Sequence, residues 1–214
     1  RDPRTMCLIS YTGGTTGFPK GAVVDHKARI VSSEASITGQ NMVDTDVAAI
    51  TTPLFHTAGL FVWYQSTVMV GQTAVLIPDW SAAAFLGAVR DHGVSSAFLV
   101  PTQIIMLLND PAFDEELFRR MGKITYGGAP MPPALNDEIL ERFPVLELSA
   151  NYGQTEACPL TVLRVDRHPD RSASLGQPPA GMEVAVLDED GNPLPPGEVG
   201  EIATRGDHVM AGYY

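Results

Sequence analysis

A glycine- and threonine-rich segment with one lysine is the part of the chain best suited to bind phosphate. It reads YTGGTTGFPKG over residues 11–21 and directly follows an apolar run. Its glycines let backbone N–H groups converge on an anion, its threonines add hydroxyl donors, and Lys20 adds a point charge. Because Lys20 follows Pro19 and precedes Gly21, the segment is not a Walker loop, and its glycines alone would equally fit a structural turn.

A second segment, NYGQTEACP over residues 151–159, combines a flat ring, a hydroxyl and a carboxylate within five residues. Tyr152, Thr155 and Glu156 suit a nucleotide and its magnesium ion. The alternative, which this segment alone would favour, is a polar loop with a surface glutamate.

A third segment, YGGAP over residues 126–130, has two glycines that permit a planar ligand to approach the backbone closely. Both this segment and the second follow a predicted strand, where ligands gather in open α/β sheets. The alternative here is an ordinary turn between a strand and a helix.

Strand-like and helix-like stretches alternate through the first 150 residues. The predicted strands are residues 6–12, 47–52, 73–77, 94–100, 123–126 and 145–149. The predicted helices run from a cap at Asp25 to residue 38, then over 57–70, 82–92, from Pro101 onward, and over 133–143. This alternation predicts an α/β fold with a mostly parallel sheet flanked by helices.

The last 45 residues change character, with predicted strands at 182–187 and 201–205 joined by a turn-rich segment. We therefore expect residues 1–170 to form an α/β part and residues 171–214 a small β-rich part of the same domain.

Composition narrows the function classes. The 214 residues carry a formal charge of −11, which gives no electrostatic reason to hold a nucleic acid. Two cysteines without a C-x-x-C pair disfavour a disulfide scaffold or a structural zinc site, and a cytoplasmic location is expected. Residues 47–78 carry no Lys, Arg, Asp or Glu, but Pro53, Gly59 and Gly71 interrupt them, so no transmembrane segment is predicted.

Together with GEIATRGDHVMAGYY over residues 200–214, the three segments resemble the adenylate-forming acyl-ligase superfamily in order and spacing. The resemblance covers essentially the whole chain and is most like an acyl-CoA synthetase. It implies a ligase that uses ATP and Mg²⁺. A carboxylic acid attacks the α-phosphate, pyrophosphate leaves, and a thiol, usually that of coenzyme A, takes the acyl group.

The resemblance also implies residue roles. The loop residues Thr12, Gly13, Gly14, Thr15, Thr16, Gly17 and Lys20 would hold the β- and γ-phosphates, with glycine at 13 where the family commonly has serine. Gly128, Ala129 and Pro130 would line the adenine and acyl pocket, Asn151 and Tyr152 would contact adenine, and Gly153 is expected among the ATP-binding residues. Thr155 would contact the α-phosphate and the substrate carboxylate, and Glu156 would bind magnesium.

His56, in PLFHTAGL, resembles the family residue beside the acyl carboxylate; the alternative is a core histidine bonded to backbone groups. Cys158 is interpreted as a small packed residue rather than a reactive thiol, since nothing basic adjoins it in sequence. The other histidines show no metal-ligand spacing and are expected to be structural or at the surface.

The family's ribose-binding aspartate, its activating lysine and its C-terminal lid domain would lie beyond residue 214, and a further segment would precede Arg1. Residues 1–214 alone are therefore expected to complete no turnover. The uncharged surroundings of His56 favour a fatty or aromatic acid. Two alternatives remain open: an amino-acid adenylation domain, which needs an acid near His56 for the α-amine, and a nucleotide-binding module without activity.

Overall fold

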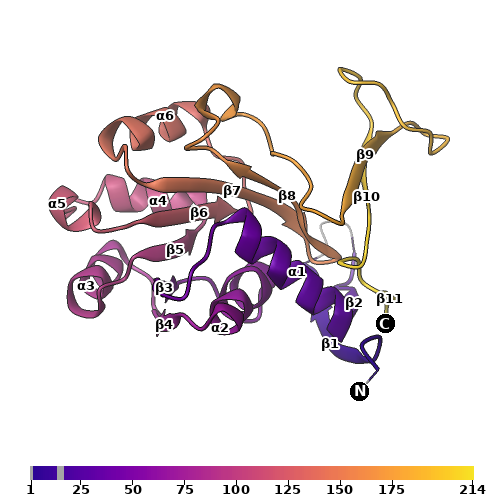
Figure 1. Cartoon of the computed structure of the whole chain (residues 1–214), viewed down its shortest axis with the longest axis horizontal. Coiled ribbons are helices and arrows are strands. Elements are labelled where there is room, and N and C mark those ends of the chain that lie inside the picture. The colour runs from indigo at the N-terminus through magenta and orange to yellow at the C-terminus, as the bar shows by residue number, and fades with distance from the viewer. Residues whose placement is uncertain (1, 14–16) are drawn as a thin grey trace.

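The central element is a six-stranded sheet with the order β4-β3-β5-β6-β7-β8. It is seen in a computed structural model that describes residues 2–13 and 17–214 (Figure 1). The strands are β3 (Val47–Ile50), β4 (Thr73–Leu76), β5 (Ser96–Leu99), β6 (Lys123–Gly127), β7 (Glu147–Gln154) and β8 (Ala157–Arg164). All neighbours pair in parallel except β7 and β8. The predicted fold class, a mostly parallel sheet flanked by helices, is confirmed.

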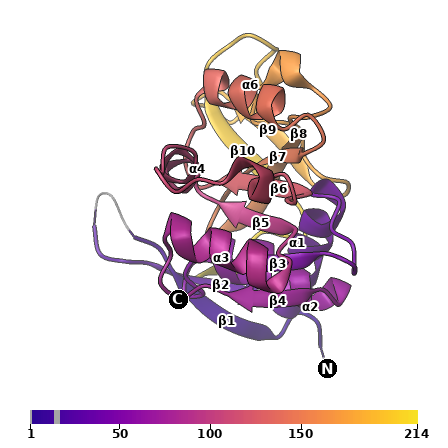
Figure 2. The same ribbon diagram turned by 90° about the vertical axis from the view of Figure 1, so that its left-hand side faces the viewer.

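Helices cover both faces of this sheet. One group is α3 (Ala82–His92), α4 (Pro101–Leu108), α5 (Glu115–Phe118) and α6 (Pro133–Arg142). The other is α1 (His26–Gly39), the π-helix η1 (Ala58–Gln65) and α2 (Ser66–Val70). Figure 2 shows α3 and α4 on one side of the strands and α1 and α2 on the other.

Side chains of β5 alternate between the two cores, as a pleated strand requires. Ala97 and Leu99 pack in the cluster that includes α3 and α4, whereas Phe98 packs with Val62 and Trp63 of η1. Because both faces are buried, this strand reads in the sequence as a continuous apolar run.

The helix boundaries follow from capping side chains and left-handed glycines. The Asp25 carboxylate accepts the N–H of Ala28 at 2.7 Å, and the Ser81 hydroxyl accepts that of Ala84 at 3.1 Å. Gly93 ends α3 with φ = 65°. The predicted starts of α1 and α3 and the end of α3 are confirmed.

A second, antiparallel sheet is formed by β1 (Met6–Tyr11), β2 (Gly21–Asp25) and β11 (Gly212–Tyr213). The sequence predicted the first of these strands as buried, but Met6 and Tyr11 at its ends are exposed. It did not predict β2. The glycine-rich segment is therefore the loop of a β-hairpin, and no helix begins directly after it.

β9 (Glu183–Leu187) and β10 (Glu201–Arg205) form an antiparallel pair, as their turn-rich connection predicts. β7, in contrast, runs on to Gln154, five residues beyond the predicted end of its strand at residue 149. The predicted strand end at residue 149 is too early, and the alternative of a polar loop does not hold for residues 151–154, because β8, which was not predicted, pairs with them. Thr155 and Glu156 form the hairpin turn between the two strands.

The predicted helix over 57–70 is real but begins as a π-helix, whose hydrogen bonds run from i to i+5. Gly59 is required there, since a Cβ atom on it would lie 2.5 Å from the carbonyl oxygen of Pro53. The Trp63 indole N–H donates to the carbonyl oxygen of Ala49 at 2.9 Å and ties the π-helix to β3. No helix within residues 2–13 and 17–214 is long and apolar enough to cross a bilayer.

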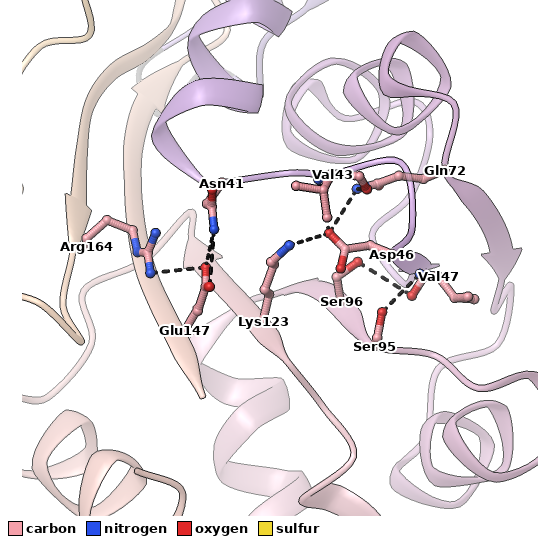
Figure 3. Close-up of polar contacts among 10 residues, drawn as sticks. All are labelled: Asn41, Val43, Asp46, Val47, Gln72, Ser95, Ser96, Lys123, Glu147 and Arg164. Atoms are coloured by element: carbon pink, nitrogen blue, oxygen red, sulfur yellow. Dashed lines mark hydrogen bonds and ion pairs between the residues drawn. The ribbon is translucent and has the colours of Figure 1, made fainter. Parts of the chain in front are cut away.

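A network of charged and amide side chains joins the amino-terminal ends of the strands (Figure 3). Lys123 Nζ lies 2.6 Å from Asp46 Oδ2, and both side chains are nearly buried, with 12% and 11% exposed. Nearby, Arg164 and Asn41 both bond the carboxylate of Glu147. The network fixes the edge of the sheet opposite to the carboxyl ends of the parallel strands.

Replacing Lys123 with Met should leave the Asp46 carboxylate nearly buried without its cation. We expect the free energy of unfolding to fall by about 1–3 kcal/mol. Urea denaturation of the variant measures this loss. Arg90→Met removes an exposed ion pair with Asp91 and is the matched control. Its urea midpoint should equal that of the wild type. Equal midpoints for both variants would contradict a stabilising role for the network.

Candidate active site

A cavity of about 310 Å³ lies at the carboxyl ends of β6 and β7. Its volume is within the range of small-molecule sites. Six sequence-predicted site residues line it: Gly128, Ala129, Pro130, Asn151, Tyr152 and Gly153. Residues 172–175 close another side. A larger open groove of about 1060 Å³ lies between α1 and β8, and none of the predicted site residues lines it.

Two glycines make this cavity possible. Gly127 pairs with Asn151 across the sheet, and a Cβ atom on Gly127 would lie 2.5 Å from the Asn151 carbonyl oxygen. Gly128 has φ = 79°, which side chains rarely tolerate, and turns the chain away from the strand. The predicted role of YGGAP, close approach to a planar ligand, therefore has a matching backbone geometry.

Asn151 carries the strongest indication that a polar ligand occupies the cavity. Its side chain is 8% exposed, and its Nδ2 donor is buried without a hydrogen-bond partner. A buried donor left unpaired costs stability, so the structure fits a ligand that offers an acceptor there. The acceptor nitrogens of a purine base have this chemistry, and the half-buried ring of Tyr152 lies on the same cavity wall.

The glycine-rich loop is closed at its base by hydrogen bonds between its two ends. The Thr12 N–H donates to the Lys20 carbonyl oxygen at 2.9 Å, and Tyr11 pairs with Gly21. Gly13 and Gly17 have open space where a side chain would stand. Gly14, Thr15 and Thr16 lie outside the described residues. Since no helix follows the loop directly, the predicted anion binding would depend on backbone N–H groups, hydroxyls and Lys20 rather than on a helix amino terminus.

Tyr213, for which the sequence predicted no role, contacts both Glu156 and Lys20. The Tyr213 hydroxyl donates to Glu156 Oε1 at 2.7 Å, and Lys20 Nζ lies 5.2 Å from the centre of the Tyr213 ring. The N–H of Met210 also donates to the Glu156 carbonyl oxygen at 2.8 Å. Tyr213 stood in the GYY end of the fourth motif, but nothing local in the sequence shows that it reaches the turn at 156.

Glu156 has the chemistry of a single protein ligand for magnesium. Among the described residues, no group of three or more His, Cys, Asp or Glu side chains is placed to hold a metal. Mg²⁺ is commonly held by one or two carboxylates together with substrate phosphates and water. A lone carboxylate in the turn after β7 fits that mode and does not fit a metal site made by protein alone. Thr155 is half-buried beside it.

His56 is exposed, so the alternative of a core histidine is wrong. Its Nδ1 accepts the N–H of Ala58 at 3.1 Å at the start of the π-helix. In the neutral ring this leaves the proton on Nε2, which is free to donate. His56 does not line the 310 Å³ cavity, and neither do Lys20, Thr155 and Glu156.

Cys158 is buried, and burial raises the pKa of its thiol to about 12. The interpretation as a packed, unreactive residue is confirmed. His208 is also buried and bonds Thr204 through Nε2 at 2.9 Å, which agrees with a structural histidine.

The family model described as AMP-binding enzyme matches residues 1–214. The chain belongs to this family, and the resemblance drawn from the four motifs is confirmed.

The chain is similar to a CoA synthase, a CoA ligase and an ATP-bound crystal structure. It is 33% identical to a feruloyl-CoA synthase of Amycolatopsis sp, over 98% of this chain and 42% of that protein. It is 32% identical to an indoleacetate–CoA ligase of Aromatoleum aromaticum, over 99% of this chain and 41% of that protein. The crystal structure of ATP-bound MatB from Rhodopseudomonas palustris matches with a TM-score of 0.90 and 28% identity, over 100% of this chain and 42% of that one. The chain thus spans about two fifths of the length of these relatives.

The contact between Tyr213 and Glu156 predicts a titration that is independent of any activity. The hydrogen bond to the carboxylate raises the pKa of the Tyr213 phenol, because ionisation would place two negative charges together. Glu156→Gln should therefore move this pKa back toward about 10. Ultraviolet difference titration, with Tyr213→Phe subtracted to isolate the residue, measures it. An unchanged phenol pKa would contradict the contact.

Proposed function

We propose that the whole protein activates a carboxylic acid with ATP, releasing pyrophosphate, and transfers the acyl group to coenzyme A. The observation that carries this proposal is the cavity at the ends of β6 and β7, which is lined by YGGAP and by Asn151, Tyr152 and Gly153, with the buried amide donor of Asn151 left unpaired in its wall. Membership of the AMP-binding enzyme family and the similarity to CoA ligases support it.

Each proposed role follows from where a residue lies. Asn151 donates to the purine, Tyr152 stacks on it, and the glycines at 127 and 128 let the base approach the backbone. The hairpin loop holds the β- and γ-phosphates, with Lys20 opposing their charge.

The reacting groups meet near the β7–β8 turn. Thr155 donates to the α-phosphate and to the substrate carboxylate, and His56 holds that carboxylate through its free Nε2–H. These donors restrain the attacking oxygen close to the phosphorus atom, which is the main contribution of a protein to phosphoryl chemistry. Glu156 would hold Mg²⁺, which supplies charge neutralisation of the phosphate oxygens.

The acid is proposed to be fatty or aromatic. Residues 47–78, which include His56 and the π-helix, carry no Lys, Arg, Asp or Glu. An amino-acid substrate would need a carboxylate near His56 for its α-amine, so this absence disfavours an amino-acid adenylation domain. The two named CoA ligases, one named for feruloyl and the other for indoleacetate, favour an aromatic acid.

Acid-dependent exchange of pyrophosphate into ATP, measured on the full-length protein, tests the proposal. Fatty, aromatic and amino acids form the panel, and AMP release on adding coenzyme A reports the second step. Exchange with aromatic or fatty acids supports the proposal. ATP binding by calorimetry without exchange for any acid would favour a nucleotide-binding module without activity.

Glu156→Gln should lower the adenylation rate and raise the Mg²⁺ concentration for half-maximal activity. The amide keeps the shape but loses the charge that a hard cation prefers. Adenylation rates across a magnesium series measure this. Glu198→Gln, an exposed glutamate in the β9–β10 connection, is the control. A wild-type rate at every magnesium concentration would remove Glu156 from the metal site.

Lys20→Met should raise the KM for ATP with little change in the KM for the acid. Methionine keeps most of the side-chain stem but removes the ammonium group, and losing a charge-assisted contact costs about 1.5–3 kcal/mol, equivalent to roughly 10- to 150-fold. Initial rates with each substrate varied in turn separate the two constants. Equal changes in both KM values would indicate a general disturbance of the loop.

A further inference from the structure

Arg29 is a buried cation without an anionic partner. Its side chain lies in the amino-terminal half of α1 and is 5% exposed. Burial lowers its pKa to about 10, and no carboxylate of the described residues contributes to holding its charge. The guanidinium remains protonated at neutral pH. A buried charge is costly unless it is paired, and a positive charge near a helix amino terminus is further disfavoured by the helix dipole.

The contacts of Arg29 leave part of its hydrogen-bonding edge unused. The guanidinium carbon lies 3.8 Å from the centre of the Phe61 ring, and Nε donates to Gln65 Oε1 at a long 3.4 Å. Nη2 is buried and has no hydrogen-bond partner. Stacking fixes the plane of the group and leaves Nη2 free. A planar guanidinium with a free edge is the group that recognises carboxylates.

The two cysteines near Arg29 do not supply the missing charge. Arg29 is close enough to Cys7 and Cys158 to favour ionisation of both thiols, yet burial outweighs it. The pKa of Cys158 rises to about 12, and that of Cys7 is also raised. Both thiols are therefore neutral at physiological pH, and the counter-ion must come from elsewhere.

Arg29 lies against the segments that carry the proposed acid site. Phe61 and Gln65 belong to the π-helix, which starts two residues after His56, and the Leu60 N–H already donates to the His56 carbonyl oxygen. At no more than about 1.5 Å per residue, Phe61 lies at most roughly 8 Å beyond His56 along the helix. Cys158, which also lies near Arg29, is only two residues after Glu156, the proposed magnesium ligand. An acyl chain that began at His56 and ran along the π-helix would bring its far end toward Arg29, because Arg29 contacts Phe61 and Gln65 of that helix.

We propose that Arg29 is a specificity residue that pairs with a second carboxylate at the far end of the acid substrate. The substrate class is then a fatty or aromatic acid that carries a distal carboxylate. The inference rests on the proposed function and deepens it, because Arg29 of α1 places a cation beside the uncharged segment that contains His56. Binding requires the terminal guanidinium nitrogens of Arg29, Nη2 among them, to face the ligand while the guanidinium stays stacked on the Phe61 ring.

Matched pairs of acids and matched variants test this on the full-length protein. The pairs are octanoate with octanedioate, and cinnamate with 4-carboxycinnamate. Arg29→Leu removes the charge, and Arg29→Lys keeps the charge but lacks the planar pair of N–H donors. The control is Ser36→Ala, at a buried position of the same helix. Two readouts are taken: kcat/KM for acid-dependent pyrophosphate release, and thermal stabilisation by each acid without ATP.

Wild type should favour each dicarboxylic acid over its partner by at least tenfold in kcat/KM. Arg29→Leu should abolish that preference through KM while leaving the monocarboxylic acids within about threefold, Arg29→Lys should restore part of it, and Ser36→Ala should resemble wild type. Wild-type preference for the monocarboxylic acids, or an equal loss for both members of a pair with a lowered melting temperature, overturns the inference and leaves the proposed adenylation intact. Arg29-dependent stabilisation by octanedioate without pyrophosphate release from any acid supports the anion site and contradicts the proposed function.

Discussion

The close approach of β6 and β7 is the constraint on which the candidate site depends. Gly127 faces the backbone of Asn151 with no room for a Cβ atom, so the two strands end side by side. That pairing joins two segments that lie more than 20 residues apart in the sequence. The left-handed turn at Gly128 then opens the cavity above them. Larger residues at either glycine would separate the strands or fill the space where the base is proposed to stack.

Much of the fold could be predicted from the sequence because its signals are local. α3 is the clearest case: Ser81 caps it, Gly93 ends it, and its apolar residues recur with helical spacing. The strands β3, β5 and β6 are short, mostly apolar runs between turn residues, which mark buried parallel strands, and the edge strand β4 is a similar run that is only partly buried.

What could not be predicted depends on partners distant in sequence. β2 and β8 are strands because they pair by hydrogen bonds with β1 and β7. The residues of β2 and β8 alone do not indicate this pairing. The same holds for the site. Tyr213 reaches Glu156 from 57 positions away, and Arg29 enters the surroundings of the π-helix from another helix. The sequence shows that residues 47–78 carry no Lys, Arg, Asp or Glu. It does not show that Arg29, which lies outside this segment, places a positive charge against Phe61 within it.

The π-helix between Ala58 and Gln65 makes the proposed acid site depend on the length of the chain as well as on its side chains. Its i-to-i+5 bonds accommodate more residues per turn than an α-helix does. Loss of one residue there would allow an α-helix to form, with fewer residues per turn, and would change which residues of the segment face Arg29. If the proposed acid site is correct, insertions and deletions in this segment would change the acid preference in a way that a comparison of aligned residue types alone would overlook.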